Sequence, residues 1–159
     1  YFGFTFDAGI HYTLKNIFDG SDLRFGLAAL NITEPSVSSS GSADAKLPMK
    51  LGLGIAYVSR NYNYLVAVDV VKERDDYTIK TGAEFLGLEH EVFNLYTAFY
   101  LRAGYDAIIN DSVYERNTLY GGFGIQVQNL VIDYAYMFPL TLQHVGGSHK
   151  ISLSYQFSF

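Results

Sequence analysis

The 159-residue chain contains no cysteine and no tryptophan, and only three prolines. Without cysteine it can form neither a disulfide nor a thiolate metal site. Charged residues make up 17% of the chain, against about 25% in an average soluble domain. Acidic residues outnumber basic ones, giving a net charge of −5. Because phosphate binding needs a basic surface, this balance argues against a nucleic-acid partner.

Long hydrophobic runs are also missing. No stretch approaches the roughly 18 to 20 apolar residues of a membrane helix, although hydrophobic residues make up 49% of the chain. Aromatic residues are abundant instead, with 14 tyrosines and 12 phenylalanines. Apolar residues as a whole recur with a period of two, and no stretch shows a competing helical period. Successive side chains of an extended chain point to opposite faces, so the sequence predicts an all-β protein.

The clearest alternation lies at the end of the chain, in Ile151–Phe159. Large apolar residues occupy one face of this stretch, and serines and Gln156 occupy the other. A strand with a wholly apolar face that ends on an aromatic residue resembles the closing strand of a bacterial outer-membrane β-barrel. In such barrels this ending is the signal that the barrel assembly machinery reads. The resemblance implies that Tyr155, Phe157 and Phe159 form an assembly signal.

Similar alternation throughout the chain predicts about nine strands, most of them long enough to cross a bilayer when tilted. The predicted strands are Phe4–Lys15, Leu23–Ile32, Met49–Tyr57, Tyr64–Val70, Tyr77–Phe85, Leu95–Tyr105, Leu119–Gln128, Leu130–Phe138 and Ile151–Phe159. The alternation slips at Ala28–Ala29, where we expect a β-bulge. Long polar loops are expected at Glu34–Pro48 and Asp106–Asn117, and a turn at Gly87–Phe93.

The opposite faces of these strands differ in a way that favours lipid over water outside. One face carries bulky apolar residues with tyrosines near strand ends, as in the aromatic girdles of membrane barrels. The other is rich in glycine and alanine, where a water-exposed face would carry lysine, glutamate and threonine. A soluble barrel or sandwich, with the apolar face inward, is the alternative. We therefore predict an antiparallel transmembrane β-barrel in contact with lipid in the bacterial outer membrane.

Alternating the connections backward from a periplasmic C-terminus places both long loops outside the cell, as such barrels prefer. The first strand then runs downward from outside, whereas a bacterial barrel begins in the periplasm. We therefore expect residues 1–159 to be the C-terminal portion of one larger barrel domain.

Six motifs occur in an order typical of one family. They are KLPMKLGLGIAY (Lys46–Tyr57), YLVAVDV (Tyr64–Val70), GAEF (Gly82–Phe85), LRAGYD (Leu101–Asp106), DYAY (Asp133–Tyr136) and GGSHKISLSYQF (Gly146–Phe157). On these motifs the chain resembles the PorV/PorQ group, barrels similar to the FadL long-chain fatty-acid transporters. The resemblance implies a fourteen-stranded barrel with an N-terminal hatch, of which this chain supplies about the last nine strands and no hatch.

Two functions follow from this resemblance. The first is passage of hydrophobic small molecules across the outer membrane. The alternative is a non-conducting scaffold or cargo-binding barrel of type IX secretion, which holds secretion components through its extracellular loops. We expect no enzymatic activity, because no Ser/His/Asp set is visible. No cofactor or metal is expected either, since His90, His144 and His149 lack metal-ligand spacing.

Candidate functional residues are those predicted to face the barrel lumen. They are Asp7, His11, Arg24, Lys50, Asp69, Lys80, Glu84, Tyr96, Tyr100, Arg102, Tyr120, Gln126 and Asp133. Charges of mixed sign on adjacent strands favour a salt-bridged network. The sharper alternative is a substrate-selecting constriction built on Lys80, Glu84 and Arg102. Asp7 and His11 are too far apart for a catalytic pair, at about 13 Å along a strand.

Overall fold

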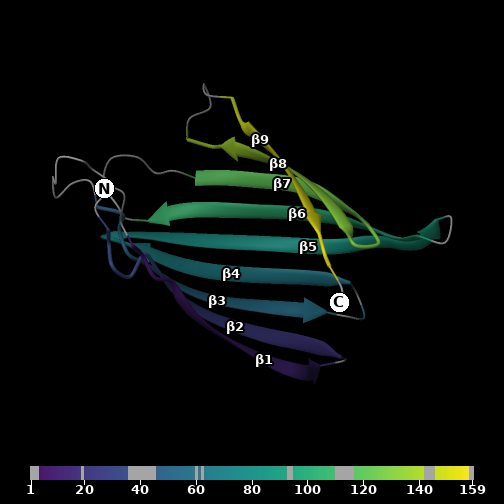
Figure 1. Cartoon of the computed structure of the whole chain (residues 1–159), viewed down its shortest axis with the longest axis horizontal. Coiled ribbons are helices and arrows are strands. Elements are labelled where there is room, and N and C mark those ends of the chain that lie inside the picture. The colour runs from purple at the N-terminus through teal and green to yellow at the C-terminus, as the bar shows by residue number, and fades with distance from the viewer. Residues whose placement is uncertain are drawn as a thin grey trace.

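The computed structural model describes residues 4–18, 20–35, 46–59, 61, 63–92, 95–109, 117–141 and 146–157. In this part of the chain nine strands form one antiparallel sheet, in which each strand pairs with its neighbours in the sequence (Figure 1). The strands are β1 (Ala8–Phe18), β2 (Ser21–Leu30), β3 (Lys50–Ser59), β4 (Tyr64–Glu73), β5 (Asp76–Val92), β6 (Leu95–Ile109), β7 (Asn117–Val127), β8 (Leu130–Pro139) and β9 (Ser148–Tyr155). The predicted all-β antiparallel fold and its nine strands are confirmed.

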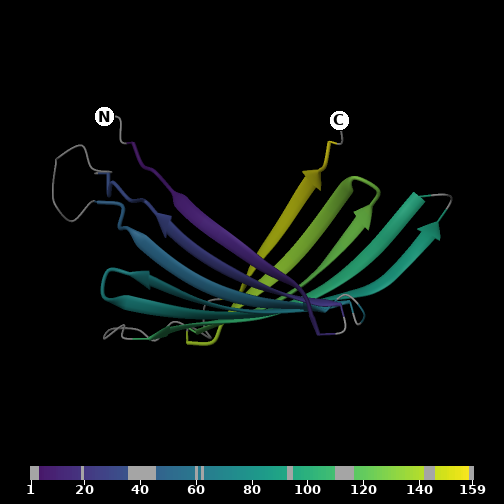
Figure 2. The ribbon, with the colours of Figure 1, turned by 90° about the horizontal axis from the view of Figure 1, so that it is seen from below.

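The sheet curves into an open trough, with β1 and β9 at its two edges (Figure 2). Within the described residues these two edge strands do not pair with each other, so the sheet is not closed. Strong curvature of this kind is the geometry of a barrel wall. Among the residues described, no helix is long and apolar enough to span a membrane.

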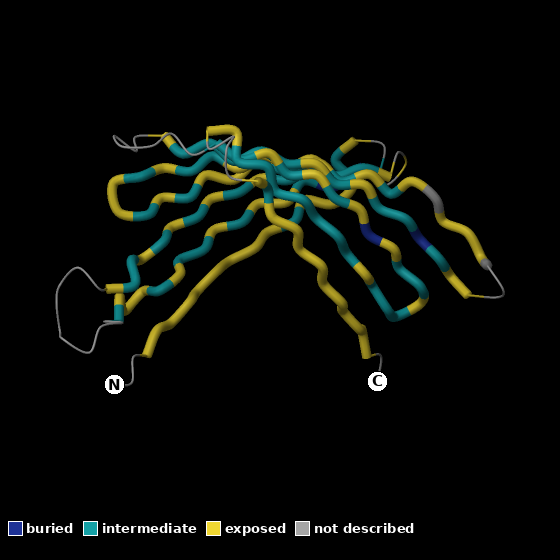
Figure 3. Tube along the Cα trace, turned by 90° about the horizontal axis from the view of Figure 1, so that it is seen from above, coloured by how far each residue is buried: buried dark blue, intermediate teal, exposed yellow. Residues whose placement is uncertain are grey.

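Most residues of this single layer are exposed or partly exposed, and few are buried (Figure 3). The exposed residues include most of the large hydrophobic ones. Ala98 is the one fully buried hydrophobic residue of the described chain, whereas Leu53 is 61% exposed and Leu153 70% exposed. Soluble monomers rarely leave so much contiguous apolar surface in water. The exposed apolar face is compatible with the predicted contact with lipid, which stays a prediction.

The predicted bulge at Ala28–Ala29 is wrong. The pairing of β2 with β3 runs without a shift up to Leu30, which lies opposite Lys50. Leu30 is the last residue of β2 and simply turns to the less apolar face, beside a hollow that has room for it. The apolar residue at this strand end therefore does not mark a change of phase.

Register shifts occur at two other places, in β1 between Leu14 and Phe18 and in β5 between Leu86 and Leu88. The second shift explains a wrong turn prediction. Gly87–Phe93 lost its alternation because of the bulge, yet β5 continues as a strand to Val92, paired with β6.

The predicted loop Asp106–Asn117 is also too long. β6 continues to Ile109, and β7 already begins at Asn117. Asp106 is therefore a strand residue, opposite Lys80 on β5 and Thr118 on β7. This change matters for function because it adds a carboxylate to the face that carries the candidate residues.

Candidate functional site

The strand register gathers the charged residues of the sheet on one face. Directly paired residues of antiparallel strands project to the same side. One such row runs from His11 through Gly26 and Gly54 to Asp69, and then through Lys80 to Asp106. We call this side the polar face. By the same pairing, the polar face holds all the candidates from His11 to Asp133.

Arg102 joins the largest group of polar-face side chains. Its Nε donates to Glu84 Oε2 at 2.6 Å, and its Nη1 donates to Asp133 Oδ1. Glu84 lies on β5, Arg102 on β6 and Asp133 on β8, so one guanidinium ties two carboxylates across four strands. We call these three residues the Arg102 bridge. Its side chains are only partly exposed, which makes the charge-assisted bonds less screened than at an open surface.

The Arg102 bridge depends on a glycine of the strand that it crosses. β7 lies between β6 and β8, with Gly122 opposite Arg102 and Gly124 opposite Asp133. A Cβ at Gly124 would overlap the Asp133 carboxylate and come within 3.2 Å of Arg102 Nη1. Any larger residue would therefore close the path, so glycine at this position is a requirement of the bridge.

Neighbouring side chains support the guanidinium. The ring of Tyr100 lies 5.4 Å from the Arg102 guanidinium carbon, within the range of a cation–π contact. The Tyr100 hydroxyl in turn donates to Gln126 Oε1 at 2.8 Å. Arg102 is thus fixed by its acids on two sides and by an aromatic ring.

A second group of side chains lies further along the same strands. Tyr120 donates its hydroxyl proton to Asp106 Oδ2 at 2.8 Å, and Lys80 Nζ lies 3.8 Å from the same oxygen. The constriction of Lys80, Glu84 and Arg102 is therefore divided: Glu84 and Arg102 pair, while Lys80 turns to Asp106. Sequence reasoning missed Asp106, although the alternation Arg102, Gly104, Asp106 carries the signal.

The polar face is different over β1–β4. A hollow of about 510 Å³ there is lined by five glycines and alanines and by five isoleucine, leucine and valine residues. His11, Lys50, Asp69 and Lys80 complete its lining. The Asp69 side chain leans across Gly54, where a Cβ would overlap its carboxylate. Lys50 lies at the end of this region and pairs with Glu73 at 2.8 Å.

The remaining candidates make local contacts. His11 Nε2 lies 3.3 Å from Thr13 Oγ1, whereas Asp7 accepts a hydrogen bond from the Asn31 backbone. The two do not form a pair. Arg24 borders a smaller hollow of about 350 Å³, and Tyr96 donates to Glu89 at 3.0 Å.

No group of three or more His, Asp or Glu side chains in the described ranges could hold a metal ion. Two members of the predicted assembly signal, Tyr155 and Phe157, lie at the exposed end of the chain, with ring centroids 4.8 Å apart. The third, Phe159, lies outside the described residues. Its role as a signal stays a prediction.

Comparison with known families decides where the chain belongs. Residues 1–155 match the family described as type IX secretion system membrane protein PorP/SprF. The chain is a member of the PorP/SprF family. No curated protein matches it, and no solved structure does either.

Membership of the PorP/SprF family confirms the predicted outer-membrane location and associates the protein with type IX secretion. It also overturns the resemblance to PorV/PorQ and FadL. The motifs behind that resemblance are alternating strands with small residues on one face, a pattern that outer-membrane strands share widely. The fourteen strands, the hatch and the passage of hydrophobic molecules were all carried over from those families, and they lose their support with it.

Proposed function

We propose that this PorP/SprF protein is a non-conducting outer-membrane scaffold, which holds other components of the type IX secretion system and catalyses no reaction. The observation that carries the proposal is the Arg102 bridge, which ties β5, β6 and β8 together on the polar face. Membership of a secretion family supports the choice of partners.

The chemistry of the polar face fits a fixed wall better than a path for apolar molecules. Sites that take up such molecules are lined mainly by apolar and aromatic groups. Here the middle of the polar face over β5–β8 carries paired charges instead. Moving Arg102 aside would leave Glu84 and Asp133 without their cation, which is costly for partly buried carboxylates. A face held in this way resists opening.

The proposal is tested with the full-length protein reconstituted in liposomes. We expect no uptake of a labelled long-chain fatty acid and no ion flux above that of empty liposomes. From cells, the tagged protein should co-purify with type IX secretion components. Uptake of the fatty acid, combined with failure to co-purify, would contradict the scaffold. Arg102→Gln is compared with Arg24→Gln, because both remove one positive charge and only the first breaks the bridge.

A further inference from the structure

The hairpin of β5 and β6 extends past the rest of the sheet (Figure 1). Pairing of β5 with β4 ends at Phe85, opposite Tyr64, whereas pairing with β6 continues to Val92. From Gly87 to Val92, β5 therefore has a strand partner on one side only, as far as the described residues extend. We call Gly87–Val92 the projecting edge.

The open side belongs to β5 and not to β6. On the far side of β6, Thr97 still pairs with Val127, and the Tyr96 carbonyl accepts a bond from Gln128 N at 2.8 Å. On the β4 side the last bond is that from Leu86 N to the Asn63 carbonyl, at 2.7 Å. The register shift after Leu86 then bends the strand, as bulges do. Among the described residues, no strand bonds to the backbone groups that every second residue of the projecting edge presents on this side.

Open backbone groups place the projecting edge in water. In hydrocarbon each unpaired group costs several kcal/mol, so an open strand edge is not tolerated there. β5 has 17 residues, whereas a tilted strand that spans a bilayer needs about 9 to 11. The excess length leaves room for the projecting edge to lie beyond the membrane.

The lengths of the connections indicate which side of the membrane this is. At the end of the sheet that carries the projecting edge, the links are short, such as residues 19–20 and 128–129. At the opposite end they include residues 31–49 and 110–116. Outer-membrane barrels keep short turns in the periplasm and long loops outside. The projecting edge therefore extends into the periplasm.

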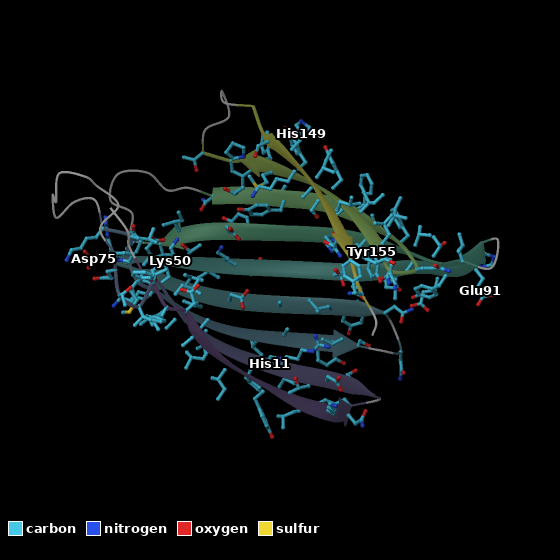
Figure 4. All side chains as sticks on the ribbon, viewed as in Figure 1. His11, Lys50, Asp75, Glu91, His149 and Tyr155 are labelled. Carbon is cyan, nitrogen blue, oxygen red and sulfur yellow. The ribbon has the colours of Figure 1, made fainter. Side chains whose placement is uncertain are left out.

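Two carboxylates give the projecting edge its charge. Glu89 and Glu91 are exposed, and their partners on β6, Ala98 and Tyr96, are neutral. Figure 4 shows Glu91 at the tip of the hairpin, far from Lys50 and Asp75 at the other end of the sheet. Glu89 accepts the bond from Tyr96, and in the described part of the chain neither glutamate forms an ion pair.

The negative charge of Glu89 and Glu91 determines which strands could pair with the projecting edge. Like charges opposite each other destabilise a strand pair, so two projecting edges of this protein repel each other. A strand with lysine or arginine at alternate positions would instead place its cations beside Glu89 and Glu91. Strand addition of this kind takes affinity from backbone hydrogen bonds and specificity from alternate side chains.

We propose that the projecting edge is a periplasmic docking site, to which a secretion component adds an extended segment with Lys or Arg at alternate positions. The inference rests on the proposed scaffold function, for which it names the place of contact and the chemistry of the partner. The added segment continues the sheet next to β5, in the space beyond the end of β4.

The test uses the full-length protein in detergent and a fluorescent seven-residue peptide that alternates lysine and threonine. Fluorescence anisotropy should show saturable binding at low salt. Methylating every backbone nitrogen of the peptide keeps its charge but removes its donors, and should raise the Kd at least tenfold. The double variant Glu89→Gln/Glu91→Gln should raise the Kd about tenfold. The matched variant Asp75→Asn/Asp76→Asn, at the opposite end of β5, should leave it unchanged.

Three results would overturn the docking site: no binding, equal binding of the methylated peptide, or the same loss in both double variants. Dimers that form through the hairpin at rising protein concentration would also overturn it, because the edge would then serve a second copy. Co-purification separates this inference from the scaffold proposal. If secretion components co-purify equally with the wild-type protein and with Glu89→Gln/Glu91→Gln, the docking site is wrong but the scaffold function is not. If they do not co-purify with the wild-type protein, the scaffold function itself is contradicted.

Discussion

Across β1–β4 the middle of the polar face, around Gly26, Ala28, Gly52 and Gly54, carries no phenylalanine or tyrosine, whereas across β5–β8 the polar face carries ionic and aromatic side chains that contact one another. The first half leaves a hollow of about 510 Å³. In the second half the Arg102 bridge and the group of Lys80, Asp106 and Tyr120 contact across the strands, and a smaller hollow of about 290 Å³ lies beside Glu84 and Arg102. Both halves have the same alternation, the same antiparallel pairing and the same apolar opposite face.

The difference shows that small residues have two distinct uses in one sheet. Gly26 lies beneath open space, since a Cβ there would meet no atom within 4 Å. Gly124, in contrast, is covered by the side chains of Arg102 and Asp133. Gly26 thus leaves a space empty, whereas Gly124 lets a cation cross a strand. We expect the Arg102 bridge to make β5–β8 the more stable part of the sheet.

The largest effect in this comparison is expected from adding side-chain volume beneath the bridge. Gly124→Val should destabilise the protein by about 2 to 4 kcal/mol, because it combines a steric overlap with the loss of an ion pair. Gly26→Val, in the other half, should change stability by less than about 1 kcal/mol, because space is available. Urea unfolding in lipid vesicles measures both. Equal losses of stability in Gly124→Val and Gly26→Val would show that the space above these two glycines does not differ.

A smaller effect is expected from removing the cation. Arg102→Gln should cost about 1 to 3 kcal/mol, because Glu84 and Asp133 then face each other without a positive charge. Partial exposure of the three side chains keeps the value below that of a fully buried pair. Adding Glu84→Gln and Asp133→Asn to the same chain should recover part of the loss. If the triple variant is no more stable to unfolding than Arg102→Gln alone, the bridge is not a source of stability.

The smallest effect is expected at the group of Lys80, Asp106 and Tyr120, the second group in β5–β8. Tyr120→Phe removes the hydroxyl that donates to Asp106 and should cost about 1 kcal/mol, the usual net value of such a bond. Tyr57→Phe provides a control, because it removes a hydroxyl that bonds to Ser21 near the end of a strand in the other half. Unfolding by urea in the same vesicles checks whether the Tyr120 loss adds to that of Arg102→Gln. Strong coupling between the two would mean that the two groups form one network.

The sequence alone was sufficient for the strands and their faces, since a period of two specifies both wherever it is unbroken. It was not sufficient for the positions of irregularities. The bulge after Leu86 falls at Gly87, and although glycine inside a strand can mark a bulge, it is equally common in turns, so the sequence alone does not separate the two. Asp106 is not predicted as a strand residue for a related reason: a polar residue near the end of a strand resembles the beginning of a loop.

The partners of Arg102 could not be predicted because they depend on register between strands. Glu84 is reached on the next strand, but Asp133 is reached only by crossing β7 at Gly124. Family identity failed for another reason. Motifs such as LGLGIAY combine a lipid-facing row with a small-residue row, and the physics of outer-membrane strands produces this combination in unrelated barrels. The match over residues 1–155 supplied what the short motifs could not.

The central claim is that this sheet separates lipid on its apolar face from water on its polar face, and β7 offers the most direct test. The chain has no cysteine, so single cysteines can be introduced without background. We predict that Tyr120→Cys and Gln126→Cys react with a water-soluble thiol reagent in intact outer membranes, whereas Leu119→Cys, Phe123→Cys and Ile125→Cys do not. Reaction at Phe123→Cys and Ile125→Cys with protection at Gln126→Cys would contradict the account.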